Sequence, residues 1–344
     1  MNKELQTQNN QEVWRTQLKD YITGLSWSKD AQWLCASSAA GEICVINTKT
    51  TQTYTHAEAH ASGIICLAHS PQENKFLSGG QDGKIRLWDT EAGNTIKELE
   101  GGSHWVEHVN WSPNGKYFAS ASGKLLRLWS AQGELIHEYI EAGSSIASLC
   151  WKADSSEMAY ACYGGVKIIK VEEKEPYQTL PWQNSMISLF WSPDSKFICA
   201  GTQDNCVHVW PLPYLLKSDF QMSGYPGKLR NMAWDSEAKF LATPNDAELI
   251  LWKFAGKIPI GTAPLTLSGH STKISALQFQ HKGKLLASAD VEGRVVLWYP
   301  ESSDKAVVKW KIGNELTSLM WAPNDLQLAT GSKNGEIVIM DIRA

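Results

Sequence analysis

Two groups of residues have the side-chain types of a hydrolytic triad. His60, Ser78 and Asp82 form the first group. The second group consists of His270, Ser288 and Glu292. A histidine between a hydroxyl and a carboxylate can act as a general base, but catalysis also needs an exposed nucleophile and an oxyanion hole. No sequence feature indicates either, so we predict no catalytic residues and no enzymatic activity.

Two histidine pairs have the spacing of a zinc-binding helix. His56 and His60 are four residues apart, as are His104 and His108. On a helix this spacing places both rings on one face, whereas on a strand residues four apart are separated by roughly 13 Å. The surrounding residues are typical of strands, and no glycine-rich loop precedes a helix. We therefore predict no metal site and no cofactor.

Composition excludes several classes of protein. The 344 residues carry a net charge of −4, which argues against a dedicated nucleic-acid binder. No apolar run approaches the roughly 20 residues of a membrane-spanning helix, and the first residues lack the apolar core of a signal peptide. The seven cysteines have no paired spacing and favour reduced thiols, so we expect a cytoplasmic protein that binds neither membrane nor nucleic acid.

Sixteen tryptophans point to an internal repeat, because most of them recur in two series. One series ends an apolar stretch at Trp27, His69, Trp111, Trp151, Trp191, Trp234, Phe279 and Trp321. The other occupies Ile46, Trp88, Trp129, Ile169, Trp210, Trp252, Trp298 and Met340. Each series has an average period of 42 residues, so the chain consists of eight similar units.

Each unit predicts four short strands, because apolar residues alternate and turn residues such as Ser-Pro-Asn-Gly separate the runs. This pattern resembles the WD40-repeat β-propeller family along essentially the whole chain. The signature dipeptides are intact at Trp88-Asp89 and at Gly269-His270. The resemblance implies an all-β fold, a single closed WD40-type β-propeller with four-stranded blades and a period of roughly 40–45 residues.

The number of blades follows from counting. We find eight three-strand cores, and a strand at about 12–18 precedes them all while none follows the last. We therefore expect eight blades, with seven as the alternative, and an N-terminal strand that completes the C-terminal blade and removes exposed edges. Residues 1–11 are expected to be a disordered tail, and residues 12–344 the propeller.

The resemblance also implies a structural role for the triad-like residues. In WD40 relatives such a set forms a buried hydrogen-bond tetrad with a tryptophan. We therefore expect one tetrad of His60, Ser78, Asp82 and Trp88. A second is expected from His270, Ser288, Glu292 and Trp298. Burial of these polar groups is tolerable because each has a partner.

Partner binding is the function that remains. In this family the loops on one face surround the mouth of the central channel, and the resemblance implies a non-catalytic scaffold for proteins or peptides. We expect Trp105 and Trp182 as anchors, with basic side chains that favour acidic segments. The expected partner-binding residues are Tyr21, His104, Trp105, Glu107, Trp182, Lys228, Arg230, Lys273, Asp290 and Lys333. Two alternatives are a metal-handling or enzymatic role at the channel mouth, and a subunit of a larger complex that makes contact through blade edges such as the one with Trp310.

Overall fold

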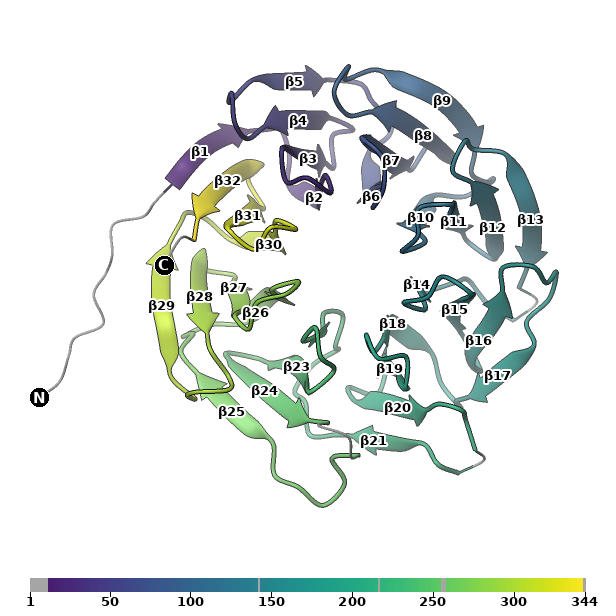
Figure 1. Ribbon diagram of the computed structural model, residues 1–344, viewed down its shortest axis with the longest axis vertical. Coiled ribbons are helices and arrows are strands. Elements are labelled where there is room, and N and C mark those ends of the chain that lie inside the picture. The colour runs from purple at the N-terminus through teal and green to yellow at the C-terminus, as the bar shows by residue number, and fades with distance from the viewer. Residues whose placement is uncertain (1–11, 142, 216, 255–257, 343–344) are drawn as a thin grey trace, which may run out of the picture. The chain divides into compact units, whose positions relative to one another are not determined.

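The computed structural model describes residues 12–141, 143–215, 217–254 and 258–342. The fold is all-β and contains eight antiparallel sheets of four strands each, the eight blades of a β-propeller (Figure 1). The prediction of eight blades is thus confirmed. The chain divides into two compact units, and the boundary falls within β2 (Ile22–Trp27). Unit 1 comprises Met1–Leu25 and Asn231–Ala344, and unit 2 comprises Ser26–Arg230.

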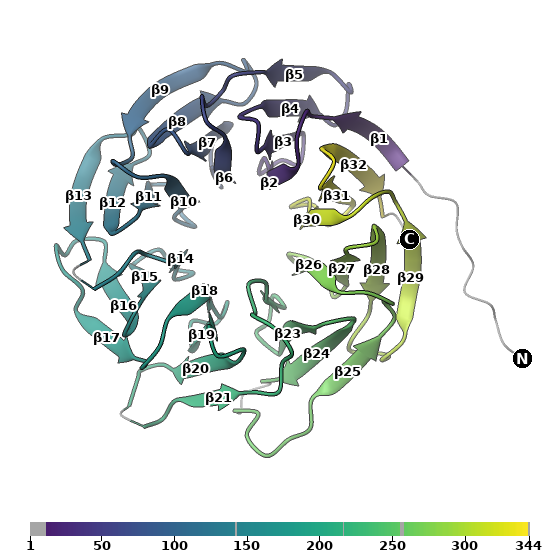
Figure 2. The same cartoon turned by 180° about the vertical axis from the view of Figure 1, so that it is seen from behind.

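Unit 2 holds the strands from β3 to β21. They are β3 (Trp33–Ser38), β4 (Ile43–Asn47), β5 (Thr53–His56), β6 (Ile64–His69), β7 (Lys75–Gly80), β8 (Lys84–Asp89), β9 (Thr95–Glu100), β10 (Val106–Trp111), β11 (Tyr117–Ser122), β12 (Leu125–Ser130), β13 (Leu135–Ile140), β14 (Ser148–Trp151), β15 (Glu157–Cys162), β16 (Gly165–Lys170), β17 (Gln178–Pro181), β18 (Met186–Trp191), β19 (Phe197–Thr202), β20 (Val207–Pro211) and β21 (Phe220–Met222). Within this unit β6, β10, β14 and β18 are the inner strands of their sheets, and β9, β13, β17 and β21 are the outer ones (Figure 2).

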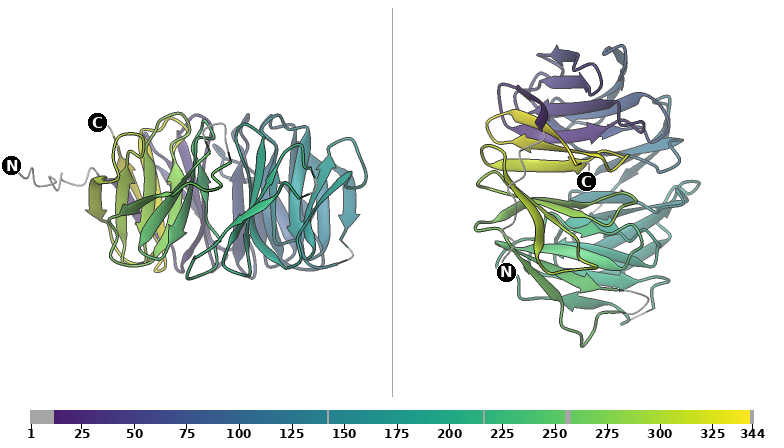
Figure 3. Two further views of the ribbon diagram at one scale, coloured as in Figure 1. Left: turned by 90° about the horizontal axis from the view of Figure 1, so that it is seen from below. Right: turned by 60° about the vertical axis from the view of Figure 1, so that its left-hand side comes forward.

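Unit 1 holds β1 and the strands that follow β21. They are β1 (Glu12–Gln17), β22 (Ala233–Trp234), β23 (Phe240–Asn245), β24 (Glu248–Lys253), β25 (Leu265–Ser268), β26 (Ile274–Phe279), β27 (Leu286–Asp290), β28 (Arg294–Trp298), β29 (Ala306–Lys311), β30 (Leu316–Trp321), β31 (Gln327–Ser332) and β32 (Glu336–Asp341). Seen side-on, each sheet has its loops at the two ends of its strands (Figure 3). Several of the expected partner-binding residues, such as Trp105, Lys228 and Lys273, lie in these loops.

The first strand completes the last blade, as expected from the sequence. Within unit 1, β1 pairs antiparallel with β32 in the sheet β1–β32–β31–β30 (Figure 1). The register matches Trp14 with Ile339 and Thr16 with Ile337, and the Leu18 amide donates to the Gly335 carbonyl at 2.9 Å. A strand from one end of the chain therefore covers the edge that the other end leaves open.

Three tryptophans of the first series join neighbouring sheets. The indole Nε1 of Trp111 donates to the Ala68 carbonyl, and that of Trp151 donates to the Asn110 carbonyl, both at 3.1 Å. Trp321 makes the same bond to Gln278 within unit 1. These rings are also buried among apolar side chains. A large apolar ring with one donor thus fills the space and satisfies a carbonyl of the adjacent sheet.

His69 takes the place of tryptophan in this series. Its Nε2 lies 3.3 Å from Thr90 Oγ1, and its Nδ1 is buried with no hydrogen-bond partner among the residues that the structure describes. Burial lowers the pKa of His69 to about 3, although the backbone of Ser26, as an acceptor, and the charge of Asp30 act in the opposite direction. The ring is therefore neutral in the folded protein at neutral pH.

This neutral ring predicts a loss of stability on acidification. In the unfolded chain His69 binds a proton near pH 6.5, whereas in the folded chain it does so only near pH 3. The free energy of unfolding should therefore fall by about 2 kcal/mol from this residue between pH 7 and pH 5. The variant His69→Phe carries the residue type that Phe279 provides at the equivalent position of its own repeat. It should remove this part of the pH dependence of the free energy of unfolding, measured by urea titration at both pH values. Equal pH dependence of the two proteins would contradict the prediction.

Three further expectations concern the N-terminal tail, the domain boundaries and membrane-spanning segments. The expected disordered tail, residues 1–11, lies outside the described residues. The assignment of residues 12–344 to one domain stays a prediction. Across the described ranges no helix is long and apolar enough to span a bilayer.

Candidate functional site

The expected tetrad residues of the second blade form a continuous hydrogen-bond chain. Trp88 Nε1 donates to Ser78 Oγ at 2.9 Å, Ser78 Oγ lies 2.7 Å from His60 Nε2, and His60 Nδ1 lies 2.9 Å from Asp82 Oδ1. Burial lowers the pKa of His60, so its ring is neutral at pH 7. Each donor in the order Trp88, Ser78, His60, Asp82 then has an acceptor.

The geometry resembles a catalytic triad, but the hydroxyl is inaccessible. Ser78 is 0% exposed, and its oxygen is already occupied by the indole and the imidazole. The sequence analysis missed Arg86, which donates to Asp82 Oδ2 at 3.0 Å and forms an ion pair with Glu98. Arg86 lies opposite Ser78 in the β7–β8 register, and this register is the signal that would have identified it.

The seventh blade corrects one residue of the second tetrad. His270 Nδ1 bonds to Asp290 Oδ2 at 2.8 Å, whereas Glu292 uses only its backbone amide toward Asp290 and its side chain is exposed. Asp290, expected at the partner-binding face, is 0% exposed. His270 Nε2, Ser288 Oγ and Trp298 Nε1 bond as expected.

The second and seventh blades use different carboxylates because they differ at one position, two residues after the tetrad serine. In the second blade this position is Gly80, where a Cβ would lie 2.1 Å from His60 Nδ1, so the carboxylate must come from Asp82 two residues later. In the seventh blade the position is Asp290 itself, whose side chain reaches the histidine directly.

The fifth blade corrects the expectation for Trp182. This ring is half-buried and packs on His208, with the ring centroids 4.0 Å apart. His208 in turn packs on Trp210 and bonds to Asp219 at 3.0 Å. Ala200 occupies the register position of Ser78, so no hydroxyl is present and aromatic stacking replaces the tetrad. Trp182 is therefore a packing residue rather than an exposed anchor.

The fourth blade contains a polar network that the sequence analysis did not identify. The buried carboxylate of Glu141 accepts bonds from Lys167 Nζ at 2.7 Å, Tyr160 Oη at 3.2 Å and the Gly143 amide at 3.1 Å. Burial by itself raises the pKa of Glu141, but these donors outweigh it and the pKa lies below its ordinary value. Tyr160 and Lys167 face each other in the β15–β16 register, as Ser78 and Arg86 do in β7–β8.

Trp105 is exposed yet held from both sides. It lies in the loop between β9 and β10, and 54% of its surface is exposed. On one side the His104 carbonyl accepts a bond from Ser122 Oγ at 2.8 Å, and the His104 ring lies against Gly123 so closely that a Cβ there would be 2.9 Å away. On the other side Val106 is fully buried. The indole is thus presented to solvent from a fixed backbone.

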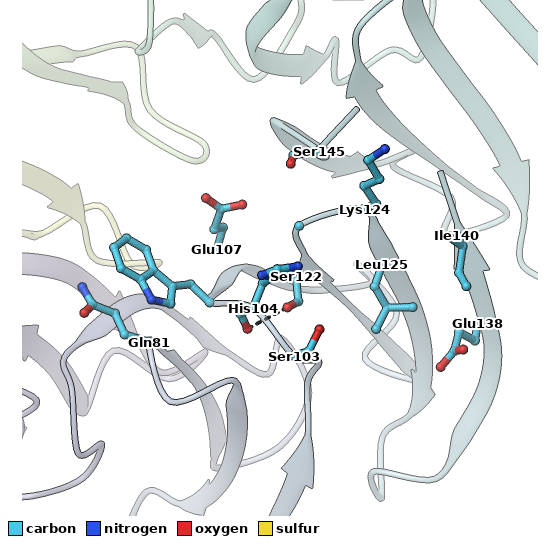
Figure 4. A pocket seen from close by; sticks show the side chains of 12 residues that line it. Gln81, Ser103, His104, Glu107, Ser122, Lys124, Leu125, Glu138, Ile140 and Ser145 are labelled. Atoms are coloured by element: carbon cyan, nitrogen blue, oxygen red, sulfur yellow. Dashed lines mark hydrogen bonds between the residues drawn. The ribbon is translucent and has the colours of Figure 1, made fainter. Parts of the chain in front are cut away.

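A pocket of about 750 Å³ opens beside Trp105 within unit 2 (Figure 4). Its lining comes from the turn between β7 and β8, the β9–β10 loop, the start of β10, the ends of β11 and β12 with the turn between them, β13 and the loop before β14. The lining residues are Gln81, Ser103, His104, Trp105, Glu107, Ser122, Gly123, Lys124, Leu125, Glu138, Ile140 and Ser145. We call this cavity the Trp105 pocket. Three expected partner-binding residues, His104, Trp105 and Glu107, meet there.

Glu107 gives the Trp105 pocket an acidic character. Burial raises the pKa of its carboxyl, and the charge of His104 acts in the opposite direction. Within the described part of the chain Glu107 has neither a hydrogen bond nor an ion pair through its side chain. The other carboxylate of the pocket, Glu138, is bound by Arg127 at 2.8 Å.

The remaining expected partner-binding residues lie outside the Trp105 pocket. In unit 2, Lys228 and Arg230 are exposed. In unit 1, Tyr21 and Lys273 are exposed, and Lys333 forms an ion pair with Glu315 at 2.9 Å. The binding roles of these residues therefore stay predictions.

The outer strands show a different pattern from the one expected. Trp310 on β29 is half-buried and packs against the core of unit 1. In unit 2, β13 exposes Leu135, Ile136 and Ile140, and Ile140 also lines the Trp105 pocket. Among the residues that the structure describes, no three His, Cys, Asp or Glu side chains gather as metal ligands do.

The repeat family named "WD domain, G-beta repeat" matches more than half of the chain. The matched segments are residues 11–47, 49–89, 93–130, 174–211 and 261–299. The fold is also similar to the crystal structure of the computationally designed Ika8 protein, with a TM-score of 0.81 and 21% identity over 96% of this chain and all of that one.

Two curated relatives are similar over part of their length. Actin-interacting protein 1 of Caenorhabditis elegans is 22% identical over 82% of this chain and 46% of its own length. The small ribosomal subunit protein RACK1y of Oryza sativa subsp. japonica is 30% identical over 44% of this chain and 49% of its own. The chain thus spans about half the length of these relatives.

Proposed function

We propose that this chain, which belongs to the WD40-repeat family, is a non-catalytic scaffold that binds a segment of a partner protein in the Trp105 pocket. WD40 propellers generally serve as protein-interaction scaffolds. The name of Actin-interacting protein 1 describes such an interaction for that relative. The cytoplasmic location and the membership of a multi-protein complex stay parts of this proposal.

The observation that carries the proposal is the exposed indole of Trp105 on a fixed backbone. Binding hot spots are enriched in tryptophan, and a residue whose backbone is already positioned loses less conformational entropy on binding. The backbone of Trp105 is fixed by the Ser122 bond before it and by the buried Val106 after it. The adjoining 750 Å³ is large enough for several side chains of an extended segment.

Trp105→Ala should weaken binding of the main partner at least tenfold while leaving the fold intact. The partner would be captured by affinity purification and identified by mass spectrometry, and its dissociation constant would then be measured by calorimetry. Tyr177→Ala is the matched control, because Tyr177 is also an exposed aromatic of unit 2 but does not line the pocket. Leu135→Lys tests the exposed face of β13. Loss of binding with Leu135→Lys alone would contradict the proposal and favour contact through the blade edge.

A further inference from the structure

A β-bulge recurs at the start of the inner strands, and one of these bulges carries a charge. The register with the second strand shifts at Ile65, Glu107, Ile187, Ser275 and Thr317. A bulge turns the side chain of its extra residue away from the ladder. Among these five positions Glu107 alone is ionisable.

The polar side chains at the equivalent bulges have backbone partners, whereas Glu107 has none. Ser275 Oγ donates to the Ala289 carbonyl at 3.3 Å, and Thr317 Oγ1 donates to the Ile22 carbonyl at 2.9 Å. A carboxylate has no hydrogen to donate, so it cannot satisfy these carbonyls. Glu107 instead lines the Trp105 pocket, where His104 acts on its charge but none of the described residues forms an ion pair with it. A half-buried carboxylate in this state is stabilised by any cation that enters.

Trp105 and this carboxylate line the same pocket, whereas Val106 between them is buried in the core of unit 2. Because the two residues are two positions apart in the chain, their Cα atoms are at most about 7 Å apart. An aromatic face attracts a cation within about 6 Å of its centre. The indole and the carboxylate therefore favour the same ligand.

The rest of the Trp105 pocket leaves room for that ligand. Lys124 extends toward Ser145 in Figure 4, well separated from Glu107. Glu138 is already neutralised by Arg127. Leu125 and Ile140 lie on the other side of the pocket from Glu107, and Ile140 is 75% exposed. One end of the pocket thus holds an indole and a carboxylate, and the other end offers the apolar side chains of Leu125 and Ile140 between Lys124 and Glu138.

We infer that the Trp105 pocket recognises a lysine or arginine side chain of a partner segment, which stacks on Trp105 and pairs with Glu107, while an apolar residue of that segment covers Leu125 and Ile140. This inference rests on the proposed peptide-binding function and gives its chemistry. It differs from the acidic partner expected from the exposed lysines, because the charge inside the pocket is negative.

The test is selection from a displayed library of random nine-residue peptides on the full-length chain. Peptides bound by the wild type should be enriched in lysine or arginine, followed or preceded by an apolar residue. For the best peptide, replacing its basic residue with alanine should raise the dissociation constant at least tenfold. Glu107→Gln should have a similar effect and flatten the salt dependence, and Glu107→Lys should reverse the charge of the selected peptides.

The outcomes separate this inference from the proposed function. If Trp105→Ala abolishes binding but Glu107→Gln leaves it unchanged, the pocket binds peptides and the basic ligand is wrong. Enrichment of acidic peptides also overturns the inference. If no peptide is selected, or if neither variant changes binding, both proposals fail. Thermal unfolding of Glu107→Gln controls for folding, and Glu134→Gln is the matched variant, because Glu134 is an exposed glutamate that does not line the pocket.

Discussion

Removal of residues 1–18 should destabilise unit 1 severely. The deletion removes β1, so β32 loses its outer partner along five matched residue pairs. It also removes Leu18, which is buried and whose amide binds Gly335. At about 1 kcal/mol for each lost hydrogen bond and roughly 2 kcal/mol for the buried leucine, the expected loss is on the order of 5 kcal/mol. The exposed edge of β32 should also promote aggregation.

Removal of residues 1–11 alone is the matched control, because it retains β1. The two truncated proteins would be compared by thermal unfolding and by light scattering at equal concentration. A synthetic peptide of residues 12–20 should restore part of the stability of the shorter chain, since it can pair with β32. Identical unfolding temperatures for the two truncated chains would show that β1 contributes nothing to unit 1.

The closure by β1 shows which part of the fold follows from the sequence. A repeat of 42 residues with matched turns determines the number of strands, and a strand left over at one end must pair with an edge left open at the other. Both arguments use only spacing. The first tetrad followed in the same way, because His60, Ser78 and Trp88 keep the separations that the family implies.

The errors concern side chains whose role depends on a neighbouring position. Glu292 lies as far from its histidine and serine in the sequence as Asp82 does from His60 and Ser78. However, the position two residues before it is Asp290 instead of a glycine, and the Asp290 side chain takes the place beside the histidine. Trp182 has the spacing of His60, but Ala200 offers it no hydroxyl. Blades with a tetrad can be told from blades without one by comparing the residues that pair in the strand register, rather than the tryptophan alone. The bulge at Glu107 depends on the strand register, so spacing alone could not reveal it.

The network of Glu141, Tyr160 and Lys167 predicts the second large effect. Lys167→Met should lower the free energy of unfolding by about 3 kcal/mol, because removal of one partner leaves a buried charge uncompensated. The Glu141 side chain is only 5% exposed, whereas Lys167 is partly exposed, so the lower end of the usual range applies. Loss of Lys167 should also raise the pKa of Glu141, since the donor that lowers this pKa most is removed and burial remains.

Two further variants show whether the charge pair is the cause. Lys196→Met makes the same substitution in the exposed pair of Lys196 with Asp194, and it should cost less than 1 kcal/mol. Lys167→Met combined with Glu141→Gln should recover most of the lost stability, because the neutral amide needs no cation and still accepts the bond from Tyr160. Urea unfolding at pH 7 of the wild type, Lys167→Met, Glu141→Gln and the double variant gives the coupling energy. A cost for Lys167→Met equal to that for Lys196→Met would mean that Glu141 is stabilised by Tyr160 and the Gly143 amide alone.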